Sequence, residues 1–252
     1  MQINVITGGA GGIGAAIGQR LGKRGERVIL ADIEEAAGES ARREIGSDAE
    51  FLNLDVSDSS SWSHLREETI LRHGHIDTLI LNAGVMSGPR GAAIDGGSSL
   101  QWLTRDAYER VMSVNQEGVV NGLLAFLPTF LEQGAGQIVV VSSVDAVIPY
   151  PQDPFYAMTK ASQLSLVRSL APALSQAGVT INAICPYAVS TELTPANFRD
   201  VPGRGMPASE FAEAVDFVLE STDTGQVWLK HPLSRDPSLY DFAPVPGVDR
   251  LY

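Results

Sequence analysis

The stretch Thr7-Gly8-Gly9-Ala10-Gly11-Gly12-Ile13-Gly14 decides the fold, because it follows an apolar, strand-like segment and opens a helical one. In such a turn, Gly8 permits a tight bend, Gly12 lets the backbone approach a pyrophosphate, and Gly14 allows close contact between helix and sheet. The N-terminus of the next helix then faces the phosphates. The stretch predicts a dinucleotide-binding turn, and the alternative is a flexible turn without a ligand.

Outward from this turn, apolar β-branched runs alternate with longer helical patterns along the chain. Runs such as Ile138-Val139-Val140-Val141 are apolar on both faces, which is typical of a parallel sheet covered on both sides. The predicted fold class is therefore α/β, a Rossmann-type doubly wound parallel sheet of about seven strands with helices on both faces. The strands are expected at 3–7, 27–32, 50–55, 78–82, 137–143, 180–186 and 226–230. The helices are expected at 12–23, 34–45, 59–72, 105–132, 153–176 and 209–219.

No internal repeat or linker divides the sequence, so we expect one domain over residues 1–252. Residues 85–103 are rich in Gly and Ser, and residues 192–207 are rich in Pro and Gly. Long irregular segments of this kind are candidate lids over a site. Residues 231–252 hold four prolines and are expected to form an extended C-terminal tail.

Composition and charge exclude several classes of function. The net charge of −12 repels phosphate backbones, which argues against nucleic acid as a partner. No apolar run approaches the ~20 residues that span a bilayer, so no membrane segment is expected. The sequence before the first strand carries no basic region or cleavage site, which favours a cytoplasmic protein.

Cysteine and histidine usage gives no indication of a metal site. The single cysteine, Cys185, permits neither an intramolecular disulfide nor a thiolate zinc cluster. His73 and His75 flank a glycine before a strand, without an evident acidic or cysteine partner, and are expected to be solvated loop residues. We therefore expect no metal.

Asp32 stands at the end of the second strand, about twenty residues after the glycine turn, where an acidic side chain binds the adenosine ribose hydroxyls. A 2′-phosphate there would be repelled by the carboxylate. Neither the glycine turn nor the position after Asp32 holds an Arg or Lys. The predicted cofactor is therefore NAD rather than NADP, and the alternative is that Asp32 only caps the next helix.

Three polar residues form a candidate catalytic set. Tyr156 and Lys160 are spaced i, i+4 on an expected helix, so they project from one face. Ser143 ends the fifth expected strand, at the edge where open α/β sheets bind ligands. An ordinary amphipathic pair is the alternative for Tyr156 and Lys160, and the adjacent Ser142 is the alternative to Ser143.

With these motifs in order, residues 1–230 resemble the short-chain dehydrogenase/reductase family. The resemblance implies an adenine contact at Asp55, with Val56 beside it, and a catalytic-helix amide at Asn115. It places Ser143, Tyr156 and Lys160 at the catalytic positions. The cofactor-binding residues that it implies, with the glycine turn, are Gly8, Gly12, Ile13, Gly14, Asp32, Ile33, Asp55, Val56, Asn82, Ala83, Gly84, Tyr156, Lys160, Pro186, Val189 and Thr191.

The family resemblance implies hydride transfer between nicotinamide and a secondary alcohol or ketone. Tyr156 would be the general acid and base, and Lys160 with the oxidised nicotinamide would favour its phenolate form. Lys160 would also bind the nicotinamide ribose, Ser143 would bind the substrate oxygen, and Asn115 would anchor a water in a proton relay. As alternatives, Asn115 is a buried structural amide and Asp55 is only an N-cap.

Topology gives a set of candidate substrate-pocket residues: Ser143, Asp145, Ile148, Gln152, Tyr187 and Met86. Asp145 would contact a hydroxyl or cation of the substrate, or else only cap a loop. Tyr187 departs from the family, which usually has Gly at this position. Its ring is expected either to narrow the pocket or to face outward against residues 192–207.

The cofactor turn, Asp32 and the last strand also show a weak likeness to the subgroup around 15-hydroxyprostaglandin dehydrogenase. The family resemblance implies a homodimer or homotetramer built through residues 105–132 and 153–176. The alternative function is a catalytically silent dinucleotide-binding regulator or structural protein. A third hypothesis is other hydride or isomerase chemistry on the same residues.

Overall fold

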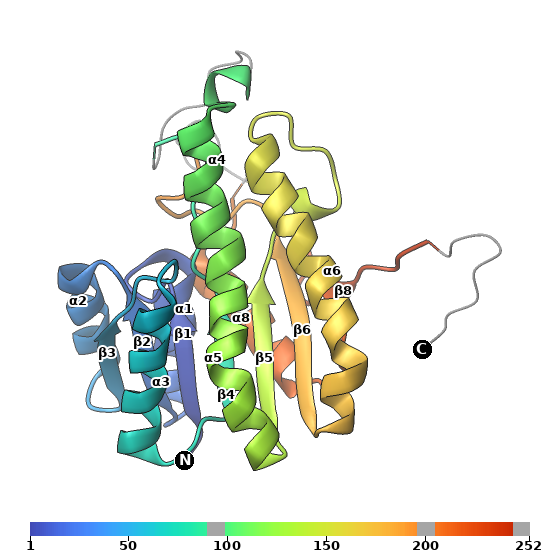
Figure 1. Cartoon of the computed structure of the whole chain (residues 1–252). Helices are drawn as coiled ribbons and strands as arrows, with labels where there is room; N and C mark the ends of the chain where they lie inside the picture. The colour runs from blue at the N-terminus through green and yellow to red at the C-terminus, as the bar shows by residue number, and fades with distance from the viewer. Residues whose placement is uncertain (90–98, 196–204, 244–252) are drawn as a thin grey trace.

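The computed structural model describes residues 1–89, 99–195 and 205–243. Its centre is one eight-stranded sheet with the strand order β3-β2-β1-β4-β5-β6-β7-β8 (Figure 1). The order reverses at β1, from which one half of the sheet runs to β3 and the other runs to β8. The strands are β1 Ile3–Thr7, β2 Arg27–Asp32, β3 Ala49–Asn53, β4 Thr78–Leu81, β5 Gly136–Val141, β6 Val179–Pro186, β7 Val227–Lys230 and β8 Ser238–Leu239.

The predicted fold class is confirmed, and the seven expected strands correspond to β1–β7, all paired in parallel. Part of the extended tail expected over residues 231–252 pairs with the sheet. It contains β8, which pairs antiparallel with β7 through Trp228 and Leu239. Residues 244–252 lie outside the described residues.

Helices cover both faces of the sheet. Because of this, β1 and β4 are buried along their whole length. Helices α1, α2 and α8 pack with one apolar cluster, and α3, α5 and α6 pack with another on the opposite face (Figure 1). The helices are α1 Gly12–Lys23, α2 Glu35–Ile45, α3 Ser59–His73, α4 Arg105–Val111, α5 Gly118–Gln133, α6 Pro154–Gln176 and α8 Ala208–Glu220.

The helix expected over residues 105–132 is not a uniform α-helix. It consists of α4, a π-helical turn η2 at Met112–Glu117, and α5. Turns of this kind widen the helix locally and often occur at functional sites. Asn115 lies in this turn and is fully buried.

The fifth strand ends at Val141, earlier than the expected 137–143. Ser142 and Ser143 follow the end of the strand, and their hydroxyls bond outside the sheet. Ser142 donates to the carbonyl of Lys160 at 2.9 Å, and Ser143 caps the short 3-10 turn η3, Val144–Ala146. The strand is therefore followed by two hydroxyl groups, of which one bonds to α6 and the other to Asp145 of η3.

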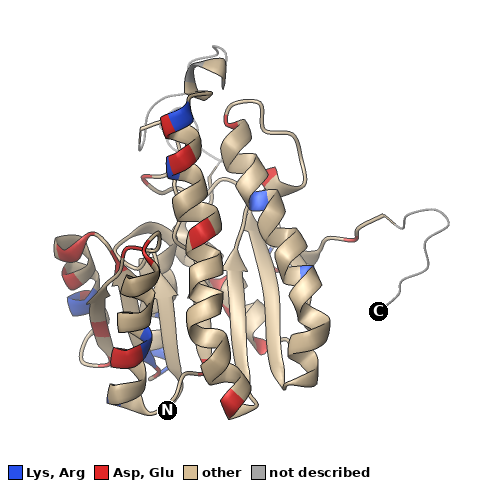
Figure 2. Ribbon diagram, in the orientation of Figure 1, with Lys and Arg blue, Asp and Glu red and all other residues tan. Residues whose placement is uncertain are grey.

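Charged residues are unevenly spread over the ribbon (Figure 2). Glu132 is the only charged residue of α5, and α6 has only Lys160 and Arg168. Leu124 and Leu131 of α5 are at least half exposed. Among the described residues, no helix combines the length and apolar composition needed to cross a bilayer.

Candidate active site

The glycine turn between β1 and α1 adopts a geometry that requires glycine. Gly8 and Gly12 have φ angles of 67° and 54°, in the left-handed region. A Cβ on Gly14 would lie 2.1 Å from the carbonyl oxygen of Gly8. The close approach of helix to strand expected from the sequence is therefore present at Gly14.

Hydrogen bonds tie the glycine turn to the end of β4. The Thr7 hydroxyl accepts from the backbone N–H groups of Asn82 and Ala83, at 3.0 and 3.1 Å. The Asn82 amide donates to the carbonyls of Thr7 and Gly8, at 2.9 and 3.3 Å. These bonds hold the two strand ends together, on either side of the point where the strand order reverses.

A cavity of about 620 Å³ runs along this edge of the sheet and fits a dinucleotide. The first turn of α1 has no side-chain cap and no acidic residue, so its N–H groups are open to an anion. At one end of the cavity, Asp32 accepts from the N–H groups of Ala10 and Glu34, at 3.0 and 3.1 Å. Tyr156 and Lys160 lie at the other end.

Most residues expected to bind the cofactor line this cavity: Gly8, Gly12, Ile13, Asp32, Asn82, Ala83, Gly84, Tyr156, Lys160, Pro186 and Thr191. Sequence reasoning missed Ala10, Gly11, Glu34, Ala37, Val141, Ser142, Ser190, Glu192 and Leu193. Glu34 and Ala37 lie at the start of α2, directly after the strand end that carries Asp32, and this position in the sequence is the signal that indicates them.

Five residues expected to contact the cofactor do not line this cavity, and one of them, Val189, lines the smaller cavity described below. Gly14 lies behind the turn as a packing position, and Ile33 is 60% exposed. Asp55 accepts from the N–H and hydroxyl of Ser57, whereas Asp58 is the residue that caps α3. Val56, the neighbour of Asp55, is buried and uses its carbonyl to accept from the Trp62 ring.

Tyr156 and Lys160 lie in the first part of α6, as the i, i+4 spacing predicts, and both are buried. The Lys160 ammonium donates to the carbonyl of Val141 at 2.8 Å and lies 5.6 Å from the centroid of the Tyr156 ring. Burial lowers the pKa of Lys160 to about 8, with the Cys185 thiol and Asp145 opposing that shift.

The pKa of Tyr156 differs from the sequence expectation. Burial raises it above its usual value, and the Asp145 carboxylate raises it further, while the Ser143 hydroxyl lowers it. In the chain alone, these effects outweigh the phenolate-favouring effect expected of Lys160. Tyr156 therefore carries its proton at neutral pH in this environment.

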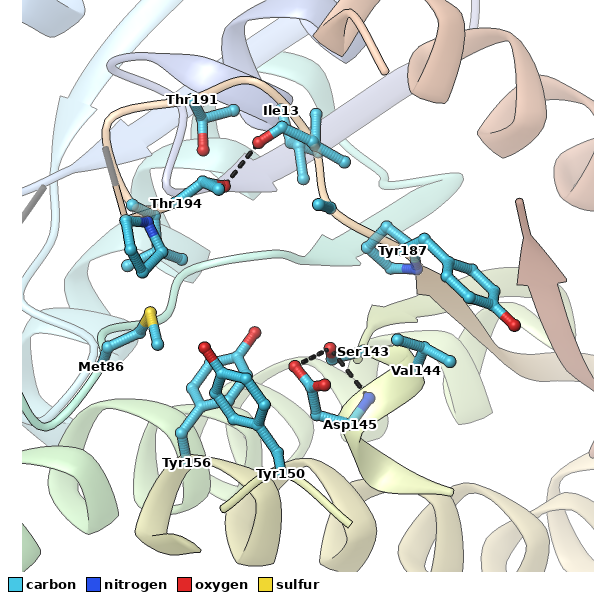
Figure 3. A pocket seen from close by; sticks show the side chains of 15 residues that line it. Ile13, Met86, Ser143, Val144, Asp145, Tyr150, Tyr156, Tyr187, Thr191 and Thr194 are labelled. Atoms are coloured by element: carbon cyan, nitrogen blue, oxygen red, sulfur yellow. Dashed lines mark hydrogen bonds between the residues drawn. The ribbon is translucent and has the colours of Figure 1, made fainter. Parts of the chain in front are cut away.

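A second, smaller cavity of about 210 Å³ opens beside Tyr156 (Figure 3). The hydroxyls of Tyr156 and Tyr150, the Met86 side chain and the Asp145 carboxylate point into it. Ser143 lines this cavity, whereas Ser142 lines the larger one, so Ser143 is the serine that faces the space next to Tyr156. The other lining residues are Ile13, Val144, Pro186, Tyr187, Ala188, Val189, Thr191, Leu193, Thr194 and Pro195.

Two hydrogen bonds connect Ser143, the N-cap of η3, with Asp145 inside that turn. The Ser143 hydroxyl donates to a carboxylate oxygen of Asp145 at 2.9 Å and accepts from the Asp145 N–H at 3.2 Å. Burial raises the pKa of Asp145, against the lowering effects of Ser143 and Lys160. Asp145 thus reaches the cavity through the same turn that positions Ser143.

Two expected pocket residues do not line the smaller cavity, and a third lines it with its ring turned outward, which is one of the two expected orientations. Ile148 is 49% exposed, and neither Ile148 nor Gln152 lines the smaller cavity. Tyr187 borders that cavity, but its ring points away from Tyr156 (Figure 3). It packs edge-on against His231, with 4.6 Å between ring centroids, rather than narrowing the pocket.

The contacts of Asn115 are those of a buried structural amide, which is the alternative expected for this residue from the sequence. Its side-chain oxygen accepts from the N–H of Val85 at 2.7 Å, and its amide donates to the carbonyl of Val85 and the hydroxyl of Thr159. Its own carbonyl accepts from Gln163 at 2.7 Å. Asn115 therefore fixes the segment after β4 against α6.

Asp153 is a site residue that the sequence pattern does not reveal, because the pattern predicts it only as the first residue of the helix. It caps α6 by accepting from the N–H of Tyr156 at 3.0 Å. It also accepts from the N–H and hydroxyl of Ser87, both at 2.6 Å. Asp153 thus joins the β4 segment to the helix turn that carries Tyr156.

The two histidines named by the sequence each lie near one carboxylate, His73 beside Glu50 and His75 beside Asp77. In the described ranges, no three His, Cys, Asp or Glu side chains are grouped as a metal site requires. Cys185 is buried, and burial raises its thiol pKa to about 12.

Comparisons with known proteins show the family of the chain. A family model described as short chain dehydrogenase matches residues 2–202. Short-chain dehydrogenase reductase 5 of Arabidopsis thaliana is 32% identical over 253 residues, which cover 100% of this chain and 94% of the relative. Tropinone reductase-like 2 of Erythroxylum coca is 29% identical, over 85% of this chain and 74% of the relative.

Two solved structures share the fold closely. The 3-ketoacyl-(acyl-carrier-protein) reductase from Brucella melitensis, complexed with NADH, has a TM-score of 0.82 and 28% identity, and covers 92% of this chain and 97% of its own. Levodione reductase has a TM-score of 0.82 and 26% identity, over 92% and 96% of the two chains. The site and fold are those of a nicotinamide-cofactor oxidoreductase, and the chain belongs to the short-chain dehydrogenase/reductase family.

Proposed function

We propose that this chain is an NAD(H)-dependent oxidoreductase that interconverts a secondary alcohol and a ketone, with Tyr156 as the acid–base residue. The observation that carries the proposal is the position of Tyr156. It lines both the cavity that fits a dinucleotide and the smaller cavity beside it. A proton carrier at that junction serves a reaction between cofactor and substrate.

The cofactor, when bound, supplies the hydride-accepting or hydride-donating ring carbon. In the reductive direction, the protonated Tyr156 hydroxyl gives its proton to the substrate carbonyl oxygen as that oxygen gains negative charge. In the oxidative direction, Tyr156 must act as a base. The Lys160 ammonium, at 5.6 Å from its ring, stabilises the phenolate needed for that step.

Ser143 and Lys160 would orient the two reactants. Ser143 would turn its hydroxyl from Asp145 to donate to the substrate oxygen, while the Asp145 N–H continues to hold the Ser143 Oγ in place. Lys160 would bind the nicotinamide ribose. Asp153 and Asn115 act through other residues, because they hold the β4 segment against the helix that carries Tyr156. The water relay through Asn115 stays a prediction.

The preference for NAD rests on Asp32, with Glu34 lining the same end of the cavity. Two carboxylates there favour ribose hydroxyls as donors and oppose a 2′-phosphate. Assembly as a dimer or tetramer would use α5 and α6, whose outer faces carry exposed Leu124, Leu131 and Met158 and few charges (Figure 2).

The test is NAD reduction, followed by NADH absorbance, over a panel of secondary alcohols, with the matching ketones and NADH in reverse. We expect turnover with at least one alcohol–ketone pair in both directions. NAD binding by calorimetry without turnover of any member would instead support the catalytically silent regulator.

A further inference from the structure

Asp145 is a carboxylate that the proposed chemistry does not use, yet it points into the smaller cavity (Figure 3). Within the described ranges, the hydrogen bond from the Ser143 hydroxyl is the one its carboxylate accepts, and it forms no ion pair. A carboxylate offers about four acceptor positions. Acceptor capacity therefore remains toward the space where a substrate would lie.

A substrate that fills this cavity must satisfy that carboxylate. Most of the lining is apolar, from Ile13, Met86, Val144, Val189 and Leu193. Covering this carboxylate with apolar groups leaves its remaining acceptor positions without water or donors, which is unfavourable. A substrate carboxylate or phosphate would be repelled. The site thus favours a substrate that brings a hydrogen-bond donor to Asp145.

The positive charges already near the site favour a neutral hydrogen-bond donor over a cationic one as the partner of Asp145. The Lys160 ammonium is already buried 5.6 Å from the Tyr156 ring centroid. A bound oxidised nicotinamide adds a second positive charge at the same junction. A third cation would meet both, so a hydroxyl is a better partner for Asp145 than an ammonium group.

The distance between Ser143 and Asp145 favours a hydroxyl on the carbon next to the reacting one. The Ser143 Oγ and the Asp145 carboxylate oxygen are 2.9 Å apart. Two oxygens on adjacent carbons of a substrate have a similar separation. An oxygen held by Ser143 therefore places the oxygen of the neighbouring carbon beside Asp145.

We propose that this site takes vicinal diols and α-hydroxy ketones, with Asp145 accepting a hydrogen bond from the hydroxyl next to the reacting carbon. This inference rests on the proposed function, because it assumes that Ser143 and Tyr156 hold the reacting oxygen. Asp145 is then the residue that separates a diol from a simple secondary alcohol of the same carbon skeleton.

The experiment compares 1,2-cyclohexanediol, as cis and racemic trans forms, with cyclohexanol, using NAD. Wild type should favour at least one diol form in kcat/KM. The ratio of diol to cyclohexanol kcat/KM should fall about tenfold or more in Asp145→Asn and in Asp145→Ala, as loss of a hydrogen bond to a charged group implies. Asp236→Asn removes an exposed carboxylate and should keep the wild-type ratio.

The outcomes separate this inference from the proposed function. Turnover of cyclohexanol with no diol preference, or an unchanged ratio in the Asp145 variants, overturns the inference and leaves the proposed function intact. If wild type turns over no alcohol of the panel, the proposed function fails. Calorimetric titration of both compounds into NAD-saturated protein then decides the inference: tighter diol binding that Asp145→Asn abolishes supports it, and equal binding overturns it.

Discussion

Replacement of Asp32 by Asn tests the cofactor preference through a single charge. The Asp32 carboxylate stays beside the glycine turn by accepting from the N–H groups of Ala10 and Glu34. An Asn side chain retains an acceptor oxygen but loses the negative charge. The variant therefore removes the repulsion toward a 2′-phosphate while preserving part of the local hydrogen bonding.

The size of the effect follows from the position of Asp32 at the rim of the cavity. Two unit charges about 4 Å apart repel by about 1 kcal/mol in water and by about 4 kcal/mol near a protein surface. Asp32 is half-buried, which places its repulsion of a phosphate between these limits, at about 2–3 kcal/mol. Wild type should therefore bind NAD roughly 100-fold more tightly than NADP.

The assay measures the Kd of both cofactors by calorimetry for wild type, Asp32→Asn and Asp48→Asn. Asp32→Asn should reduce the NAD-to-NADP preference at least tenfold, mainly by improving NADP binding. Asp48→Asn carries the same charge change at an exposed position paired with Arg27, and should keep the wild-type preference. Wild type that binds NADP as tightly as NAD would refute the reasoning, as would an unchanged preference in Asp32→Asn.

Two further substitutions test the glycine turn and the buried lysine. Gly14→Ala, whose Cβ would lie 2.1 Å from the Gly8 carbonyl oxygen, should lower the free energy of unfolding by about 2 kcal/mol and weaken NAD binding. Gly11→Ala meets no atom within 4 Å and should stay within about 0.5 kcal/mol of wild type by urea denaturation; equal effects would contradict this account. The pKa of Lys160 falls from 10.5 to about 8, so its burial destabilises the folded state by about 3 kcal/mol below pH 8, and this penalty fades as pH rises toward 10.5. Lys160→Met should therefore gain stability relative to wild type at pH 7 and lose most of that gain by pH 10, whereas a pH-independent difference would argue against a charged buried Lys160.

The parts of the structure that could be predicted depend on local patterns. The glycine turn and the strands have their signals within a few residues, as does the Tyr156–Lys160 pair on one helix face. Their order along the chain then brings them to one sheet edge, because parallel strands share their carboxyl ends. That is why most expected cofactor residues line one cavity.

The parts that could not be predicted depend on contacts between distant segments. Asp153 binds Ser87, which is 66 residues away, and nothing beside Asp153 in the sequence indicates that partner. The Tyr187 ring turns toward His231 because a side chain from beyond β7 offers it a packing partner. The π-helical turn around Asn115 has the same apolar periodicity as an ordinary helix, so its sequence does not reveal it.

The pKa of Tyr156 is another property that the sequence pattern does not predict. Helical spacing predicts that Lys160 is near, and this is confirmed. The spacing gives no measure of burial, and burial together with Asp145 raises the pKa in the chain alone. The balance of charges at the site therefore required the three-dimensional arrangement.

Turnover by Tyr156→Phe, measured with NADH binding on the same preparation, tests the central claim most directly. The ring remains in its buried position, so the NADH Kd should stay within about threefold of wild type. Loss of the proton carrier should lower kcat by about 10²- to 10⁴-fold with any alcohol–ketone pair that wild type turns over. A kcat within about tenfold of wild type would contradict the assignment of Tyr156 as the acid–base residue.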